Sequence, residues 1–139
     1  MLDEAYELLD GPPAATEAVE VRRRAGLTPK TLEQTVAALA GGWSAAHVVL
    51  RETGELVGMG RVIGDGGWYF HIADMCVLPE HQRRGVGDAV LTHLIDGIRA
   101  ATPADPYITL LADPPGRALY RRHGFVDTAP GSVGMVQRR

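Results

Sequence analysis

The stretch DMCVLPEHQRRGVG, residues 74–87, joins an apolar run to a turn that contains two arginines and two glycines. The apolar run ends at VLP, and a helical pattern begins near Gly85. The first turn of a helix has unpaired N–H groups and carries the positive end of the helix dipole. Gly85 and Gly87 let the main chain approach a ligand without a Cβ atom, and Arg83 and Arg84 add positive charge. The stretch therefore predicts an anion-binding turn between a strand and a helix.

The rest of the chain reads as strands and helices in an order typical of one mixed α/β domain. Strands are expected at residues 5–11, 45–52, 56–64, 68–79, 107–112 and 131–137. Helices are expected at residues 13–26, 28–42, 85–102 and 115–125. Residues 5–11 could instead form an N-terminal arm. Thr28 is expected to be the N-cap of the second helix and Pro29 its first residue. Helices followed by strands and then by β-α-β-α-β predict a mixed sheet with helices on both faces.

Composition limits the class of protein. With 139 residues, 45% of them hydrophobic, the chain is long enough for one domain with a buried core. Its apolar runs are too short for a membrane span and its acidic N-terminal sequence has no signal pattern, so a cytoplasmic location is expected. A net charge of −3 argues against nucleic acid as the main partner. Cys76 is the only cysteine, so no internal disulfide is possible.

Several other phosphate-binding and catalytic motifs are absent from the sequence. A P-loop needs Gly-Lys-Ser/Thr, and the only lysine is Lys30. A dinucleotide fingerprint needs a third glycine, whereas DAV follows GVG here. No HExxH, cysteine pair or Gly-x-Ser-x-Gly occurs, so no metal site and no hydrolase nucleophile is supported. The phosphate-binding pattern that remains is Gln82-x-x-Gly85-x-Gly87. The alternative is that the glycines only allow the helix to start there and that the arginines are solvated.

This pattern resembles the pyrophosphate loop of the GNAT superfamily of acetyltransferases, which cradles coenzyme A. DMCVLP before it resembles the superfamily's strand-into-loop signature, and LYRRHGF at 119–125 resembles its second landmark. Both occur in the right order along the chain. The resemblance implies that residues 1–139 form a single GNAT domain, whose mixed and mostly antiparallel sheet splays at its central strand.

The C-terminal half is similar to one branch of that superfamily, the plant and cyanobacterial serotonin (arylalkylamine) N-acetyltransferase-like proteins. The segments that carry the similarity are GMGRVIGDGG at 58–67, ITLLAD at 108–113, LYRRHGF, and GSVGM at 131–135. They span roughly residues 56–136. The similarity implies transfer of an acetyl group to a small primary amine, arylalkylamine-like or other, although many bacterial acetyltransferases share these features.

Acetyl-CoA is the cosubstrate that the resemblance implies. Its pantetheine arm is expected along the main chain of Met75, Cys76 and Val77, where a bulge frees an N–H group for the thioester carbonyl. Arg121 and Arg122 are candidates for holding its 3′-phosphate. The residues expected to contact the rest of the cofactor are Gln82, Arg83, Arg84, Gly85, Val86, Gly87, Asp88 and Tyr120.

The chemistry requires an oxyanion site, a neutral amine and an acid for the departing thiolate. Tyr120 matches the superfamily's tyrosine and is the expected acid. The alternative is that it is only a buried aromatic residue of an amphipathic helix. Asp113 is expected to act as base or to orient the amine, and a helix N-cap is its alternative. Asp74 and His71 compete for this role, since Asp74 suits a cationic amine and His71 has the ordinary pKa of a base. Trp68 is expected near the substrate.

Other residues receive simpler interpretations. Cys76 is read as a core thiol, so direct transfer in a ternary complex is expected. Arg22–Arg24 are read as a solvated helix face. Asp65 is read as a turn residue, and Arg61 is expected to pair with a carboxylate or to close the acceptor site.

The acceptor is expected in a groove between the first helices and the loops near Trp68, with a homodimer as an option. The alternatives are a protein, peptide or drug N-acetyltransferase, a non-catalytic acyl-CoA sensor, and a toxin that acetylates aminoacyl-tRNA. A net charge of −3 makes the last of these unattractive.

Overall fold

The computed structural model describes residues 1–102 and 104–138. One five-stranded sheet runs through the molecule in the order β1-β2-β3-β4-β5. Its strands are β1 (Tyr6–Asp10), β2 (Ser44–Leu50), β3 (Leu56–Gly64), β4 (Tyr69–Val77) and β5 (Tyr107–Leu110). The first four strands pair antiparallel and β5 pairs parallel with β4. The predicted mixed and mostly antiparallel sheet is confirmed.

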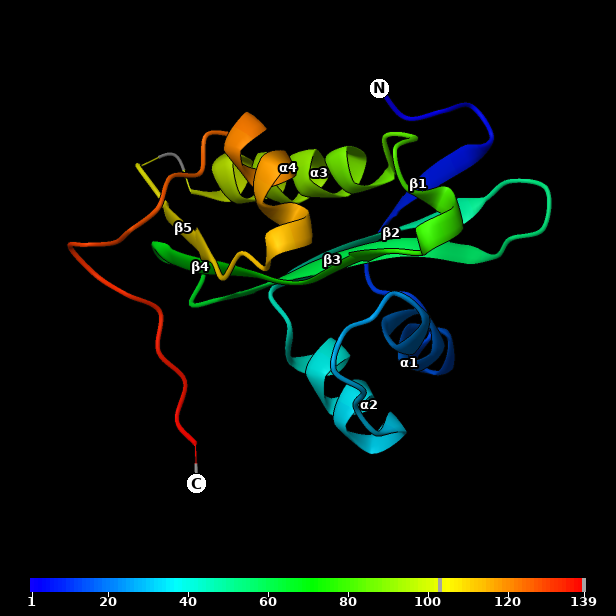
Figure 1. The fold of residues 1–139 in the computed structure, drawn as a ribbon, viewed down its shortest axis with the longest axis horizontal. Helices are drawn as coiled ribbons and strands as arrows, with labels where there is room; N and C mark the ends of the chain where they lie inside the picture. Colours follow the sequence, from blue (N-terminus) through cyan, green and yellow to red (C-terminus); the bar gives the residue numbers. More distant parts are fainter. Residues whose placement is uncertain (103, 139) are drawn as a thin grey trace.

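Helices cover both faces of this sheet, as predicted (Figure 1). Their bounds are α1 (Ala15–Arg24), α2 (Leu32–Gly41), α3 (Val86–Ala101) and α4 (Arg117–Arg122), with short 3₁₀ turns η1 (Pro79–His81) and η2 (Pro114–Gly116). The helices α1 and α2 lie on one face, and α3 and α4 lie on the other. Among the described residues, no helix is both long and apolar enough to cross a membrane.

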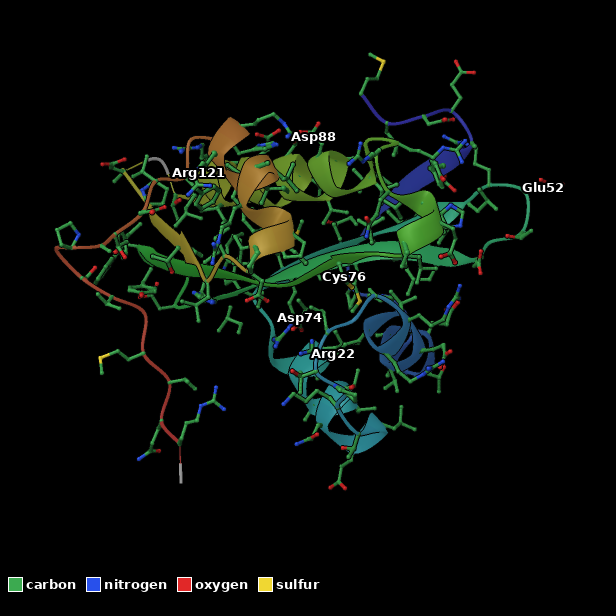
Figure 2. The ribbon with its side chains drawn as sticks, viewed as in Figure 1. Arg22, Glu52, Asp74, Cys76, Asp88 and Arg121 are labelled. Atoms are coloured by element: carbon green, nitrogen blue, oxygen red, sulfur yellow. The ribbon has the colours of Figure 1, made fainter. Side chains whose placement is uncertain are left out.

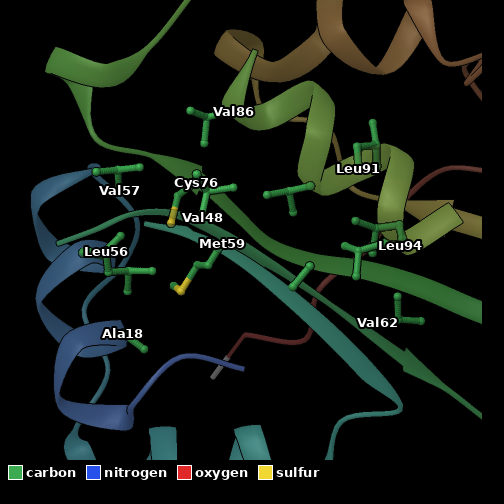
Figure 3. Packing of buried hydrophobic residues seen from close by; sticks show 14 of the residues in the cluster. Ala18, Val48, Leu56, Val57, Met59, Val62, Cys76, Val86, Leu91 and Leu94 are labelled. Atoms are coloured by element: carbon green, nitrogen blue, oxygen red, sulfur yellow. The ribbon is translucent and has the colours of Figure 1, made fainter. Parts of the chain in front are cut away.

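The core is built by the apolar faces of these helices against the sheet (Figure 3). Val86, Val90, Leu94 and Ile98 recur at helical spacing along α3, and all four are buried. Gly60 of β3 lets this helix come close, because a Cβ there would lie 2.9 Å from Val90 and 3.2 Å from Leu94. On the opposite face, α1 buries Ala18 and Val21.

The start of α2 differs from the prediction. Thr31, rather than Thr28, is the N-cap, and its hydroxyl accepts a hydrogen bond from the Gln34 N–H at 3.0 Å. The Gln34 side chain accepts one in return from the Thr31 N–H. This reciprocal capping box satisfies two N–H groups of the first turn, whereas Pro29 at a helix start would satisfy none. The pattern Thr-x-x-Gln was present in the sequence.

The strand expected at residues 131–137 is not formed. The segment has no ladder partner, and Val133, Met135 and Val136 are exposed. Gly134 lies beside the side chain of Leu111, but β5 has already ended at Leu110. A strand needs a neighbouring edge for its N–H and C=O groups, so strand propensity alone was insufficient.

The strand β4 carries a bulge, as expected. Arg61 pairs with Ala73 and Met59 pairs with Cys76, so two residues of β4 lie opposite Gly60. Asp74, one of these two, has a left-handed φ of 58°. Parallel pairing between β4 and β5 ends at Ile72, so the two strands separate just where the bulge begins.

Candidate active site

The turn between β4 and α3 presents unpaired backbone N–H groups. Arg83 and Gly85 both have left-handed φ angles, 62° and 85°, and Gly85 is the N-cap of α3. The N–H groups of residues 83–88 donate to no backbone carbonyl of a described residue. Successive N–H groups in such a conformation form a concave site for anions. The geometry of the turn therefore agrees with the interpretation drawn from the sequence.

The N-terminal residues pack against this turn. A Cβ on Gly85 would collide with the main chain of Met1 and would come within 3.0 Å of Leu2. The Asp3 carboxylate lies 3.2 Å from the guanidinium of Arg84, which also sits over the ring of Tyr6 at 5.3 Å. Arg84 is therefore engaged by the protein's own groups.

The edge of β4 beyond the bulge faces the opening between β4 and β5. Among the loop residues, Gln82 reaches back to this edge, since its side-chain amide donates to the Val77 carbonyl at 3.2 Å. Met75 points its side chain toward α3, because a Cβ on Gly60 would lie 2.5 Å from the Met75 sulfur. The main chain of Met75 and Val77 therefore borders the opening.

Tyr120 lies half-buried on α4. Burial, followed by the negative charge of Asp113, raises the pKa of its phenol above the ordinary value of 10.0. The ring is closely flanked by Gly116, where a Cβ would lie 2.7 Å from the ring. A phenol with a raised pKa remains protonated at neutral pH and can donate a proton.

The helix that carries Tyr120 is tied to the start of α3. Asp88, in the first turn of α3, lies 2.6 Å from Nε2 of His123, which caps the end of α4. Leu119 packs at Gly87, where a Cβ would lie 3.2 Å from its Cδ2. These contacts hold α4 against the first turn of α3.

Asp113 stands before η2, between β5 and α4. It occupies the N-cap position, but its side chain makes no capping hydrogen bond. The carboxylate is exposed and influences Tyr120 electrostatically. Its carboxylate therefore remains available for other partners, beside the expected acid.

Asp74 is clamped between two arginines. Its Oδ1 accepts a hydrogen bond from Nη1 of Arg22 at 2.6 Å, and its Oδ2 accepts one from Nε of Arg61 at 2.5 Å. Burial alone would raise the pKa of this carboxyl. The hydrogen bonds and charges of Arg61 and Arg22 outweigh burial and hold its pKa below the ordinary 3.8. Asp74 is thus ionised at neutral pH and is a weak proton acceptor.

A cavity of about 190 Å³ lies between the first two helices and the sheet and reaches this clamp. It is lined by Pro13, Ala18, Arg22, Lys30, Gln34, Thr35, Ala38, Leu39, Ala45, Met59, Gly60, Arg61 and Asp74. Figure 2 shows Arg22 and Asp74 between the sheet and α1 and α2. The cavity therefore lies beside the first helices, as expected for the acceptor groove, but at the bulge of β4 and not at the loops near Trp68.

His71 and Trp68 lie outside that cavity. Nδ1 of His71 is 3.0 Å from the Thr109 hydroxyl, and burial together with the Arg61 charge lowers its pKa. Trp68 belongs to an exposed aromatic group with Tyr69 and Tyr107. The structure brings neither residue to the cavity lining, and Tyr120 and Asp113 do not line it either. Nearby, the turn role of Asp65 is confirmed, since its Oδ1 accepts three backbone N–H bonds.

Arg22 is the site residue that the sequence interpretation missed. The reading of Arg22–Arg24 as a solvated face is wrong for Arg22, whose side chain is only 16% exposed. It follows Val21 and lies four residues after Ala18, both buried on α1. Helical spacing therefore turns Arg22 inward while Arg23 stays exposed. That spacing was the available signal.

Cys76 lies two residues after Asp74, but its thiol is not a reactive nucleophile. Burial, then the negative charge of Asp74, raises the pKa of its thiol to about 12. A thiol with that pKa is almost wholly protonated at neutral pH, and the thiolate is the nucleophilic form. Among the residues that the structure describes, no group of three or more His, Cys, Asp or Glu side chains gathers to hold a metal ion.

Comparison with known proteins identifies the family. The family model described as "Acetyltransferase (GNAT) domain" matches residues 43–127, which is more than half of the chain. The chain therefore belongs to the GNAT family of acetyltransferases. A probable acetyltransferase of unknown function from meticillin-resistant Staphylococcus aureus is 32% identical, with a TM-score of 0.89 over 96% of this chain and 99% of that one.

Other relatives agree with this assignment. A GNAT-family acetyltransferase from Streptococcus pneumoniae shares the fold at 20% identity, with a TM-score of 0.76 over 96% of this chain and 98% of that one. The uncharacterized N-acetyltransferase ycf52 of Porphyra purpurea is 36% identical over 58% of this chain and 45% of its own length. A chloroplastic GCN5-related N-acetyltransferase of Arabidopsis thaliana is 36% identical over 60% of this chain and 34% of its own length. The chain thus spans less than half the length of these two curated relatives.

Proposed function

We propose that this protein transfers the acetyl group of acetyl-CoA to a primary amine on a small molecule. The observation that carries the proposal is the opening of the sheet at the bulge of Asp74. Two further features of the described residues support it: the unpaired N–H groups of the turn before α3, and the Tyr120 phenol, whose pKa is raised. Family membership supports acetyl transfer and leaves the acceptor open.

The described residues fit coenzyme A in two places. The concave turn at residues 83–88 offers N–H donors for a pyrophosphate, where Arg83 adds an exposed positive charge. The main chain of Met75–Val77 borders the opening of the sheet and can pair with the amide groups of a pantetheine arm. Arg84 already shares its guanidinium with Asp3 through Nη2, so its role is secondary in this proposal.

The reaction that we propose is direct attack of the amine on the thioester. The amine nitrogen forms a bond to the acetyl carbon, the C–S bond breaks, and the amine loses one proton. Tyr120 supplies a proton to the departing thiolate, and a backbone N–H at the bulge stabilises the negative oxygen of the intermediate. The protonated thiol of Cys76 favours this direct route over an acetylated enzyme.

Asp113 is the residue that we assign to the amine. In this proposal Asp113 accepts the proton of the amine, directly or through water. Its carboxylate is exposed, makes no helix-capping hydrogen bond, and is close enough to Tyr120 to raise the pKa of that phenol. Asp74 is the weaker candidate, since two guanidinium groups lower its pKa. The similarity to arylalkylamine acetyltransferases makes tryptamine and phenylethylamine reasonable acceptors to test.

Thiol release from acetyl-CoA tests this function with a panel of tryptamines, phenylethylamines, polyamines, amino sugars, amino acids and short peptides. We expect turnover on one class of amine. Tyr120→Phe should lower kcat about 100-fold, the size typical of a lost general acid, and Asp113→Ala should lower it as well. Turnover that survives Asp113→Ala would move the proton acceptor to water or Asp74.

Calorimetric titration with acetyl-CoA separates the alternatives. Binding without turnover on any amine would favour a non-catalytic acyl-CoA sensor, and absence of binding would overturn the assignment of the turn. Peptide-only turnover would indicate a protein N-acetyltransferase.

A further inference from the structure

The cavity beside the bulge is positively charged inside an acidic protein. Its charged lining comprises Arg22, Lys30, Arg61 and Asp74, so three positive charges and one negative charge leave an excess of two positive charges. The whole chain, in contrast, has a net charge of −3. Lys30 forms no ion pair within the described part of the chain, which leaves its ammonium group available at the cavity rim.

Arg22 and Arg61 each have N–H donors that no described group accepts. Arg22 uses Nε for the Thr28 carbonyl and Nη1 for Asp74. Arg61 uses Nε for Asp74 and Nη1 for a backbone carbonyl of α2. The Nη2 groups of both arginines donate to none of the groups that the structure describes. The N–H groups on Nη2 can donate charge-assisted hydrogen bonds to a carboxylate or phosphate.

Asp74 does not supply a free anionic site for a purely cationic amine. Each of its oxygens already accepts a guanidinium group, and the two arginines carry more charge than it neutralises. A cation placed beside this clamp meets net repulsion, which is strong where water is partly excluded. The side chains of Arg22, Arg61 and Asp74 are 16%, 17% and 24% exposed, so water screens this charge only in part.

The remaining cavity wall suits a small molecule with both polar and apolar parts. Gln34 and Thr35 contribute polar groups from α2, while Leu39 and Met59 contribute apolar ones. A second cavity of about 280 Å³ shares Arg61, and there the buried hydroxyl of Ser44 has no partner among the described residues. The carboxylate in that second lining, Asp10, already faces His93 at 2.8 Å.

We propose that the acceptor is an amine that also carries a carboxylate or phosphate group, and that Arg22, Arg61 and Lys30 bind that group. This inference rests on the proposed function, because it names the substrate class of the same site. It replaces the cationic arylalkylamine with a zwitterionic or anionic amine.

Matched pairs of acceptors test the inference. Tryptophan is compared with tryptamine, which lacks only the carboxylate, and phosphoethanolamine is compared with ethanolamine, which lacks only the phosphate. The two pairs distinguish a carboxylate from a phosphate preference. We expect at least one of the two acceptors that carry a carboxylate or phosphate to have a KM about 10-fold below that of its partner, the size of one charge-assisted hydrogen bond.

Lys30→Gln and Arg99→Gln form a matched set of variants. Lys30 is exposed at the cavity rim, whereas Arg99 is exposed on α3, on the opposite face of the sheet, and each substitution removes one positive charge. Lys30→Gln should raise the KM for the acceptor that carries the carboxylate or phosphate about threefold, and it should not raise the KM for its cationic partner. Arg99→Gln should change neither value.

Binding of the same pairs, measured by calorimetry with CoA present, gives an answer that does not depend on turnover. A preference for the member with the carboxylate or phosphate that weakens in Lys30→Gln supports the inference even if no thiol is released, in which case only the proposed function fails. Equal binding of both members, or tighter binding of tryptamine and ethanolamine, overturns the inference while thiol release still supports the enzyme.

Discussion

Gly116 packs against the ring of Tyr120, so that a Cβ at position 116 would lie 2.7 Å from Cε2 and 3.2 Å from the phenol oxygen. The glycine ends η2 and the tyrosine lies on the helix that follows immediately. The absence of a side chain at Gly116 therefore determines where the proposed acid sits.

Gly116→Ala should lower kcat about 10-fold, because the new methyl group displaces the Tyr120 ring and a misplaced catalytic group is ineffective. The KM for acetyl-CoA should change little, since neither the turn nor the open strand edge is altered. Steady-state kinetics measure both quantities. Gly97→Ala is the control, because a Cβ at Gly97 meets nothing within 4 Å. Equal kcat values in the two variants would refute this packing role.

Asp74→Asn should lower the free energy of unfolding by about 1–3 kcal/mol near pH 7, because the two guanidinium groups lose their charged partner. Asparagine tolerates a left-handed φ, so the bulge should persist. The folded pKa of Asp74 lies below its ordinary 3.8, so the carboxylate stabilises the fold above that value. This stabilisation is lost as the pH falls through the folded pKa.

Urea denaturation from neutral to acidic pH measures this difference. The gap between the wild type and Asp74→Asn should close on acidification, since a protonated aspartate resembles asparagine. Asp96→Asn, an exposed position on α3, serves as the control. A gap that stays constant with pH would contradict the clamp.

Cys76→Ala should keep most of kcat and lose about 1–2 kcal/mol of stability, because the thiol fills space in the core and does not react. Its pKa of about 12 leaves almost no thiolate near neutral pH. Mass spectrometry of the wild type mixed with acetyl-CoA alone should show no acetylated Cys76. A covalent acetyl group on this residue would instead establish a two-step mechanism.

Asp3→Asn should lower the KM for acetyl-CoA about twofold, because Arg84 is released to contact the pyrophosphate. Asp3 now holds that guanidinium at 3.2 Å. Glu20→Gln removes an exposed ion pair with Arg23 and should leave this KM unchanged. A raised KM in Asp3→Asn would mean that the pair instead organises the turn.

The sequence allowed the central part of this fold to be predicted because local patterns determine it. The glycine turn, the helical stripe of α3 and the apolar strand before it each follow from spacing alone. The bulge, in contrast, came from resemblance, since no residue pattern near Asp74 requires it. The segment 131–137 has strand-like residues, but its conformation depends on a neighbouring edge that sequence does not reveal.

The acceptor side was harder to predict because it is assembled from distant segments. Arg22 and Asp74 are 52 positions apart in the chain, and neither alone indicates a partner. The arginine run obscured Arg22, although its position on the buried stripe of α1 was readable. The charge of the cavity became visible only when α1, β3 and β4 were brought together.

The bulge at Asp74 also bears on how this protein can evolve. One residue meets two separate demands there, a left-handed main chain and a negative charge between two arginines. Asparagine or glycine can adopt the left-handed main chain but lacks the negative charge. Mutational drift at this position can therefore alter which acceptor the cavity admits while the sheet stays open, so that substrate preference diverges among descendants before architecture does.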